Sequence, residues 1–130
     1  MSLSNLEKAL RKSWAKETSY FPDLWTADNS ALGQCAVTAL VVNDYLGGEI
    51  VWAEAVLPDG QTISHYFNLI DGKEIDLTRS QFPERTAIPK GVMKNKNFTT
   101  TRDFVLSSEN TRKRYEILRA VVTQCLKEEI

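Results

Sequence analysis

The most informative segment of the chain reads Gly33-Gln34-Cys35-Ala36-Val37-Thr38-Ala39-Leu40-Val41-Val42-Asn43-Asp44-Tyr45-Leu46-Gly47-Gly48. Its apolar residues recur at steps of three and four, which is the spacing of one face of an α-helix, and they cover most of the circumference. The glycine pair at its end supplies the left-handed residue that commonly ends a helix. We therefore predict a buried helix that has Cys35 in its first turn.

The position of Cys35 has chemical consequences. The first turn of a helix presents free backbone N–H groups and the positive end of the helix dipole. Both favour the thiolate over the thiol, and the thiolate is the reactive form of cysteine. A buried cysteine is, however, more often a small apolar core residue than a nucleophile. The interpretation of Cys35 therefore depends on the polar partners that the rest of the chain brings to it.

The composition is that of an ordinary globular domain. The chain has 130 residues, a net charge of −1, 42% hydrophobic residues and 25% charged residues. This predicts one domain over residues 1–130 with a substantial core, and it gives no reason to expect binding to nucleic acid or to a membrane. No apolar run approaches the ~20 residues of a membrane span, and the N-terminus lacks the pattern of a signal peptide. We therefore expect a cytoplasmic protein.

The cysteine and histidine content argues against a metal site. In a cytoplasmic chain, Cys35 and Cys125 are expected to be free thiols. Cys125 lies in an apolar helical pattern near the C-terminus, and we interpret it as a core residue. One histidine with two distant cysteines is a poor zinc-binding set, so we expect neither a metal nor a cofactor. The sequence carries no signal for an oligomeric state.

Three antiparallel strands are predicted after the central helix. Residues 49–57, 62–70 and 73–78 have the β-branched and aromatic content of strands. They are separated by the turn sequences Pro58-Asp59-Gly60-Gln61 and Asp71-Gly72, which are typical of hairpins. The pattern therefore indicates a meander of three strands.

Two further helices are predicted at the ends of the chain. The first begins at a capping box formed by Ser4 and Glu7 and ends near Glu17, and the last covers residues 109–128. The inward face of the last helix is predicted to carry Tyr115, Leu118, Val122 and Cys125, and its outward face Arg112, Lys113 and Arg114. Residues 79–101 carry no clear pattern and are expected to line or cover a cleft. We predict an α+β fold in which the central helix packs on a small antiparallel sheet flanked by the terminal helices.

The single histidine, His65, lies in the second predicted strand. If Asp71-Gly72 form the centre of the second hairpin, Phe67 faces Asp76, and His65 becomes a diagonal neighbour of Asp76 on the same face. A three-residue loop would separate the two side chains. The predicted helix-facing side carries Ile63, His65, Phe67 and Leu69, and the opposite side carries Ser64, Tyr66 and Asn68. Asp76 is therefore a candidate for the group that orients His65.

Glu54 is a second candidate partner for His65. If Asp59-Gly60 form the centre of the first hairpin, Glu54 lies opposite His65. A cysteine nucleophile, a histidine that carries its proton and a carboxylate that orients the histidine make up a catalytic triad. The backbone N–H of Cys35 can donate to an oxyanion. The alternative is a core histidine bonded to Asp76, with Cys35 unrelated to it.

Gly33-Gln34-Cys35 and the small apolar residues after it resemble the nucleophile helix of the papain-like cysteine hydrolases, and most closely the Gly-Gln-Cys of transglutaminases. The order of cysteine, histidine on a strand and aspartate on the next strand is also that superfamily's order. Most of the chain resembles the small bacterial YunG-like proteins. The segments that carry this second resemblance are Ala31-Leu32-Gly33-Gln34-Cys35-Ala36-Val37-Thr38-Ala39-Leu40-Val41-Val42, Ser64-His65-Tyr66 and Glu74-Ile75-Asp76-Leu77-Thr78-Arg79. The resemblance implies a papain-like fold and the candidate triad Cys35, His65 and Asp76, but no substrate.

The chain departs from these relatives around the nucleophile. Ala36 stands where papains and transglutaminases usually carry tryptophan, and Asn29 stands where papains place an oxyanion-hole glutamine. Asn29 and Gln34 are candidates for supporting the oxyanion, and Gln34 is alternatively a residue that shapes the turn. A purely structural or assembly role has little in its favour, and two other functions stay open. One is a thiol-dependent hydrolase or acyltransferase that acts on an amide or thioester (a peptidase, deamidase or transglutaminase-like enzyme) with a peptide or small amide substrate. The other is a catalytically inactive papain-like binding or regulatory module.

Overall fold

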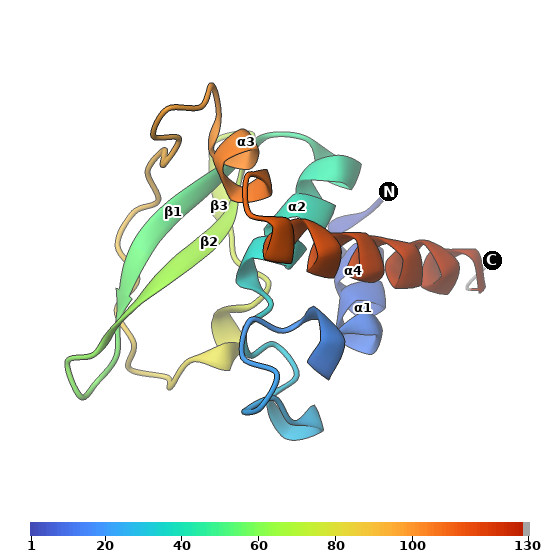
Figure 1. The fold of residues 1–130 in the computed structure, drawn as a ribbon, viewed down its shortest axis with the longest axis horizontal. Helices are drawn as coiled ribbons and strands as arrows, with labels where there is room; N and C mark the ends of the chain where they lie inside the picture. Colours follow the sequence, from blue (N-terminus) through green and yellow to red (C-terminus); the bar gives the residue numbers. More distant parts are fainter. Residues whose placement is uncertain (129–130) are drawn as a thin grey trace.

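The predicted central helix is α2, Cys35–Leu46, in the computed structural model, which describes residues 1–128. Cys35 is its first residue, as the sequence indicated, and Gly47 ends it with a φ of 74°. Six consecutive residues of α2, from Val37 to Val42, are buried, because the helix packs against the sheet and against two other helices. The almost wholly apolar circumference of this segment is therefore explained by contacts on several sides (Figure 1).

The structure is an α+β fold with a small antiparallel sheet and flanking helices, which confirms the predicted fold class at this level (Figure 1). The other helices are α1 (Leu3–Ser13), α3 (Thr101–Leu106) and α4 (Glu109–Glu128). The strands are β1 (Glu49–Val56), β2 (Thr62–Ile70) and β3 (Lys73–Ile75), in the spatial order β1-β2-β3. Short 3₁₀ turns are η1 (Lys16–Thr18), η2 (Ala27–Asn29) and η3 (Arg79–Gln81).

The second hairpin has the predicted register. Asn68 pairs with Ile75 and Ile70 with Lys73, so Asp71 and Gly72 form a two-residue turn. The strand itself is shorter than predicted, because β3 ends at Ile75 and Asp76 lies just beyond it. Asp76 therefore does not take part in the backbone pairing of β2 and β3, although it stays next to the position that the register predicts for it.

The first hairpin does not have the register that would place Glu54 at the candidate site. Ala53 pairs with His65, and Glu54 pairs with Ser64. The loop contains five residues, 57–61. It is closed by a hydrogen bond from the Leu57 nitrogen to the Gln61 oxygen (2.8 Å), and Gly60 allows the turn with a φ of 90°. An odd loop length shifts the pairing by one residue and sends Glu54 to the other face, where it is exposed.

The prediction of which face of β2 meets the helix was wrong. The face with Tyr66, Asn68 and Ile70 packs on α2, and the Asn68 amide donates to the Ala39 carbonyl oxygen (3.0 Å). Phe67, on the same side as His65, belongs to a second small core of Val51, Ala53 and Phe67 with Leu69 and Ile88 packed against it. The sequence pattern did not predict the correct face because both faces of β2 are covered, so neither face has the pattern of a solvent-exposed one.

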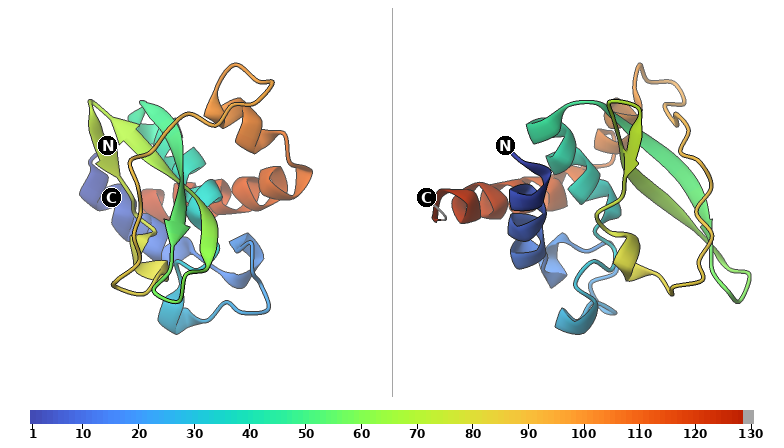
Figure 2. Two further views of the ribbon diagram at one scale, coloured as in Figure 1. Left: turned by 90° about the vertical axis from the view of Figure 1, so that its left-hand side faces the viewer. Right: turned by 180° about the vertical axis from the view of Figure 1, so that it is seen from behind.

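The chain from η3 to α3 covers the second face of the sheet. Figure 2 shows α1, α2 and α4 on one side of the sheet and this segment on the other. It is tied to the β1 edge by Trp52, whose nitrogen donates to Val92 (2.8 Å), and by Val56, whose nitrogen donates to Ala87 (2.9 Å). Gly91 permits the close approach, since a Cβ there would lie 2.8 Å from the Phe67 ring.

The terminal helices differ in how well they were predicted. α4 has the predicted bounds within the described residues, whereas α1 begins earlier and ends earlier than expected. Its N-cap is Ser2, whose hydroxyl accepts from the Asn5 nitrogen (3.1 Å), so Ser4 does not cap the helix. Within residues 1–128, no helix has both the length and the apolar character needed to span a membrane.

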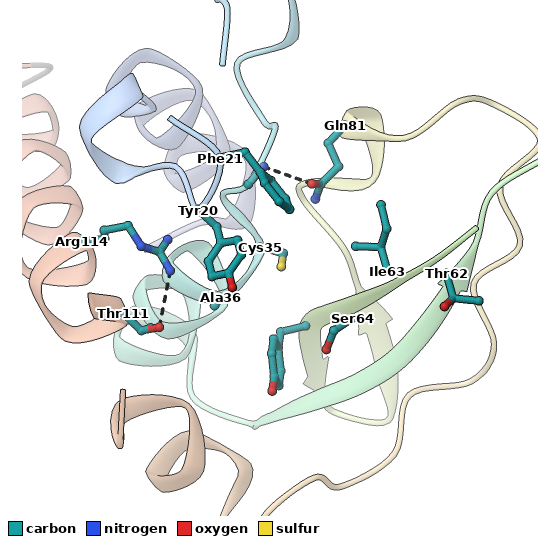
Figure 3. Close-up of a pocket in the computed structure, with 12 residues that line it drawn as sticks. Tyr20, Phe21, Cys35, Ala36, Thr62, Ile63, Ser64, Gln81, Thr111 and Arg114 are labelled. Carbon is teal, nitrogen blue, oxygen red and sulfur yellow. Dashed lines mark hydrogen bonds between the residues drawn. The ribbon is translucent and has the colours of Figure 1, made fainter. Parts of the chain in front are cut away.

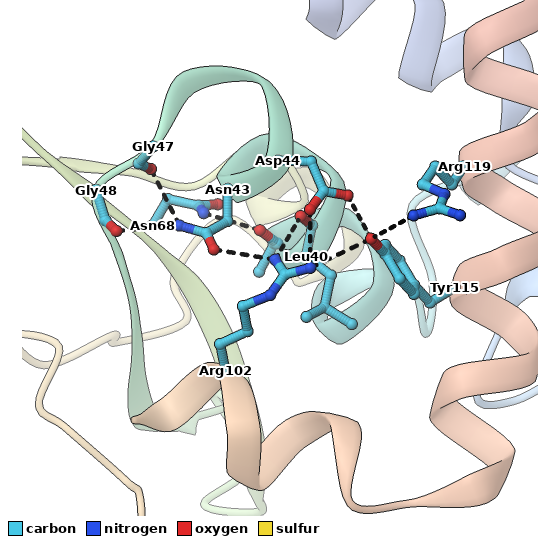
Figure 4. A network of polar contacts seen from close by, with 10 residues as sticks. Leu40, Asn43, Asp44, Gly47, Gly48, Asn68, Arg102, Tyr115 and Arg119 are labelled. Atoms are coloured by element: carbon cyan, nitrogen blue, oxygen red, sulfur yellow. Dashed lines mark hydrogen bonds and ion pairs between the residues drawn. The ribbon is translucent and has the colours of Figure 1, made fainter. Parts of the chain in front are cut away.

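The short helix α3, which no sequence pattern predicted, is joined to α2 and α4 by one arginine (Figure 4). Arg102 donates to the carboxylate of Asp44 (2.8 Å), to the Asn43 side chain (2.9 Å) and to the Leu40 carbonyl oxygen (3.2 Å). The Tyr115 hydroxyl donates to the same Asp44 and accepts from Arg102 (3.2 Å). This network holds α3 against the main core.

Candidate active site

A cleft of about 410 Å³ lies at the N-terminal end of α2 (Figure 3). Its walls come from the loop before α2, the start of α2, the half of β2 that is not paired with β3, η3 and the first turns of α4. The lining residues are Tyr20, Phe21, Gly33, Cys35, Ala36, Thr62, Ile63, Ser64, Tyr66, Gln81, Thr111 and Arg114. Cys35 is half-buried and is therefore reachable from the cleft.

The first turn of α2 is left without a side-chain cap. Gln34 occupies the N-cap position, but its side chain makes no capping bond. The first nitrogen that bonds back along the helix is that of Thr38, which donates to the Gln34 oxygen (2.9 Å). The N–H groups of Cys35 and Ala36 thus lack an intrahelical acceptor, as is general for the first turn of a helix. Both residues line the cleft.

Gln34 has a structural role that explains why it does not cap the helix. Its side chain is fully buried, its Oε1 accepts from the Thr18 hydroxyl (2.8 Å), and its Nε2 donates to the Ala15 oxygen (2.9 Å). Gly33, with a φ of 73°, makes the turn before it, where a Cβ would overlap the Ser19 hydroxyl. Gln34 therefore shapes the turn, which was one of its two predicted roles, and does not donate into the cleft.

His65 has no exposed surface and is paired with Asp76. Its Nε2 lies 2.7 Å from the Asp76 Oδ2, and the Asp76 side chain is 17% exposed. The ring stacks on Phe67 at a centroid distance of 5.5 Å and meets the edge of Phe82 at 4.9 Å. Packing on two aromatic rings and a bond to a carboxylate together fix the orientation of the imidazole.

The second ring nitrogen of His65 faces a different environment. Nδ1 is buried and has no hydrogen-bond partner of normal geometry among residues 1–128. Burial lowers the pKa of His65, but the hydrogen bond to Asp76 and the interaction with the Cys35 side chain outweigh it and raise the pKa from 6.5 to about 9. At neutral pH the ring is therefore an imidazolium with an N–H at both nitrogens, and Cys35 is the partner that interacts with it besides Asp76.

Two other residues predicted for the site lie elsewhere. Asn29, in η2, donates its amide to the Gln81 backbone oxygen (3.2 Å) and is not part of the cleft wall. Glu54 is exposed on β1 opposite Ser64, for the reason of register given above. The backbone N–H groups at the start of α2 are therefore the better candidates for receiving an oxyanion.

Several residues of the cleft were not predicted from the sequence, above all Gln81 and Arg114. Gln81 accepts from the Gly33 nitrogen (3.2 Å) and donates to the Thr78 hydroxyl (3.0 Å), so it ties η3 to the turn before Cys35. It comes from the stretch without a pattern, and no signal in the sequence could have found it. Within residues 1–128, no group of three or more His, Cys, Asp or Glu side chains is arranged to hold a metal ion.

Comparison with known proteins places the chain among proteins of one family. The family described as YunG protein matches residues 2–127. The protein YunG of Bacillus subtilis (strain 168), described as uncharacterized, is 32% identical over 80 residues, which cover 62% of this chain and 63% of that relative. The chain thus matches less than two thirds of the length of this curated relative. No solved structure matches this chain significantly.

Proposed function

The chain belongs to the YunG protein family, and we propose that it is a papain-like, thiol-dependent hydrolase or acyltransferase acting on an amide or thioester. The observation that carries the proposal is the environment of His65. Its fully buried ring is bonded at 2.7 Å to Asp76 and interacts with Cys35, which stands at the uncapped start of α2 in the wall of a cleft. A nucleophile next to a base that a third group orients is the signature of covalent catalysis.

The first half of the proposed reaction forms an acyl-enzyme. The Cys35 thiolate attacks the carbonyl carbon of the substrate, and the backbone N–H groups of Cys35 and Ala36 receive the oxyanion. The His65 imidazolium then gives its Nδ1 proton to the leaving nitrogen or sulfur as the bond from that atom to the carbonyl carbon breaks. The amine or thiol leaves, and the acyl group stays on the Cys35 sulfur as a thioester.

The second half releases the acyl group. Water, in a hydrolase, or a substrate amine, in an acyltransferase, attacks the thioester while the neutral His65 takes its proton. The bond from the carbonyl carbon to sulfur breaks, and the carboxylic acid or new amide departs from the Cys35 thiolate and the His65 imidazolium. Asp76 holds the ring throughout and stabilises its charged form.

An inactive papain-like binding module is the second candidate, and one observation favours it. The side-chain amides of Asn29 and Gln34 are both used in structural hydrogen bonds, so neither adds an oxyanion donor to the backbone groups. Loss of one such donor typically costs a factor of about 10² to 10³ in rate. Only a test for turnover separates a weak enzyme from a binding module.

The test is formation of an acyl-enzyme from p-nitrophenyl acetate, an activated ester. The proposal expects a burst of nitrophenol and a mass increase of one acetyl group, located on Cys35 by peptide mass spectrometry. Cys35→Ala should abolish both signals, and Cys125→Ala, which removes the other free thiol, should change neither. Equal acetylation of Cys35 and Cys125, or none at Cys35, would leave the binding-module function in its place.

A further inference from the structure

Arg114 is a charged residue in the wall of the cleft. The sequence pattern had predicted it on the outward face of α4. Its exposed fraction is 7%, whereas its neighbours Arg112 and Lys113 are exposed. Figure 3 shows its side chain beside Tyr20 and Thr111 at the margin of the cleft that contains Cys35. Buried charges in proteins are normally paired with an opposite charge.

The hydrogen-bond partners of Arg114 are all uncharged, and the Cys35 side chain in the same cleft interacts with its charge without a hydrogen bond. Its Nε donates to the Asn110 side-chain oxygen (2.9 Å), one terminal nitrogen to the Thr18 carbonyl oxygen (3.1 Å) and the other to the Thr111 hydroxyl at 3.4 Å. The Tyr20 ring lies 5.5 Å from the guanidinium carbon. A guanidinium has five N–H groups, so these bonds leave two of them without an acceptor among residues 1–128.

A comparison with Arg102 shows that Arg114 lacks an acidic partner. Arg102 also lies between helices and has the same kinds of neutral partner, but it has in addition an ion pair with Asp44 at 2.8 Å. Within residues 1–128, Arg114 makes no ion pair, and none of the residues that line the cleft is an aspartate or glutamate. Arg114 is also the only lysine or arginine among those lining residues.

The other residues that line the cleft indicate the chemical class of ligand that it can bind. Phe21, Ile63 and Ala36 supply apolar surface, and Ser64 and Thr111 supply hydroxyl groups. A volume of about 410 Å³ lies within the range of small-molecule sites, which is about 300 to 1,000 Å³. A planar guanidinium with free N–H groups on its terminal nitrogens matches a carboxylate, which it binds with two parallel bonds.

We propose that the cleft binds a substrate that carries a carboxylate, and that Arg114 is the specificity-determining residue that recognises this group. The inference rests on the proposed function, because it places the carboxylate on the same molecule whose carbonyl Cys35 attacks. The source of the carboxylate is either the C-terminus of a short peptide or an acidic side chain, since the guanidinium recognises the same group in both.

Two alkylating reagents of nearly the same shape test the inference. Iodoacetate carries a carboxylate and iodoacetamide a neutral amide, and each transfers its carbon to the Cys35 sulfur with loss of iodide. We expect the ratio of the iodoacetate rate to the iodoacetamide rate at Cys35 to fall about tenfold in Arg114→Gln, the size expected for losing one charge-assisted interaction. Arg114→Lys should keep part of the preference, and Arg112→Gln, an exposed arginine on the same helix, should leave the ratio unchanged. The positive charge of His65 is the same in all these variants, so the change in the ratio reports on Arg114.

The outcomes separate this inference from the proposed function. If iodoacetamide reacts at Cys35 no faster than at Cys125, the proposed function fails. If Cys35 is reactive but the ratio is the same in the wild type and in Arg114→Gln, only the carboxylate inference fails.

Competition on the wild-type protein keeps the test valid even if Arg114→Gln does not fold. N-Acetylglycinate, a C-terminal carboxylate, and N-acetylglutamic acid α-amide, an acidic side chain, should slow the iodoacetamide reaction at Cys35. Whichever protects at the lower concentration identifies the source of the carboxylate. N-Acetylglycinamide should not protect. Protection by this amide equal to that by both carboxylates, or equal protection by inorganic phosphate, would overturn the assignment of a carboxylate site.

Discussion

Replacing Asp76 by asparagine removes the carboxylate that holds His65 in its charged form. Asparagine has nearly the same shape and keeps an oxygen that can accept a hydrogen bond, so the packing of the ring on Phe67 and Phe82 is preserved. The burial of His65 stays, and burial by itself lowers its pKa. In the variant, the lowering of the His65 pKa by burial is therefore no longer outweighed by the carboxylate.

The magnitude follows from the position of His65. Its pKa in the folded protein is raised from 6.5 to about 9, and each pKa unit corresponds to about 1.4 kcal/mol. The imidazolium thus contributes at most about 3 kcal/mol to the free energy of unfolding. Because the folded pKa lies above the unfolded one, this stabilisation is fully present below pH 6.5 and is lost as the pH rises through about 9. Loss of one neighbouring opposite charge should move the His65 midpoint down by about one to three pH units.

The assay is an NMR titration of the imidazole carbon-bound protons, which needs no assignment because the chain has a single histidine. We expect a midpoint near 9 in the wild type and a clearly lower one in Asp76→Asn. Asp59→Asn, which removes an exposed carboxylate at the tip of the first hairpin, is the matched control and should leave the midpoint in place. An unchanged midpoint in Asp76→Asn, or a wild-type midpoint below 6.5, would refute the electrostatic account of His65.

Two further predictions concern the scaffold. Gly33→Ala should lower the free energy of unfolding in urea by about 2 kcal/mol or more, because the residue has a φ of 73° and a Cβ would overlap the Ser19 hydroxyl. Gly60→Ala, with a φ of 90° and open space around it, should cost less, and an equal loss in both would contradict the packing argument. Arg102→Ala should speed hydrogen exchange in α3 and destabilise the fold by about 1 to 3 kcal/mol, since it leaves the partly buried Asp44 carboxylate with one partner fewer. Exchange in α3 equal to that of the wild type would show that the network does not hold this helix.

The parts of the fold that the sequence predicted well are those whose signals are local. The bounds of α2 and α4 follow from apolar periodicity and, for α2, from Gly47. The register of the second hairpin follows from the two-residue turn at Asp71 and Gly72 alone. That register places His65 beside Asp76, although β3 ends before the aspartate.

The parts that the sequence did not predict depend on distant segments. The covered second face of β2 could not be inferred, because the segment around Gly91 that covers it has no periodic pattern. The first hairpin was misread because a five-residue loop and a four-residue loop share the same turn residues but differ in parity. Arg114 has the sequence context of a solvated helix face, and only the packing of α4 against Thr18 shows that it is buried.

The most direct test of the central claim is the rate of iodoacetamide alkylation at Cys35 and at Cys125 at neutral pH, followed by peptide mass spectrometry in the wild type and in His65→Ala. We expect Cys35 to react faster than Cys125 in the wild type, because it lies at the uncapped start of α2 and interacts with His65, and we expect His65→Ala to slow Cys35 and to leave Cys125 unchanged. Equal rates at both cysteines, or an unchanged Cys35 rate in His65→Ala, would contradict the claim that Cys35 and His65 form a catalytic pair.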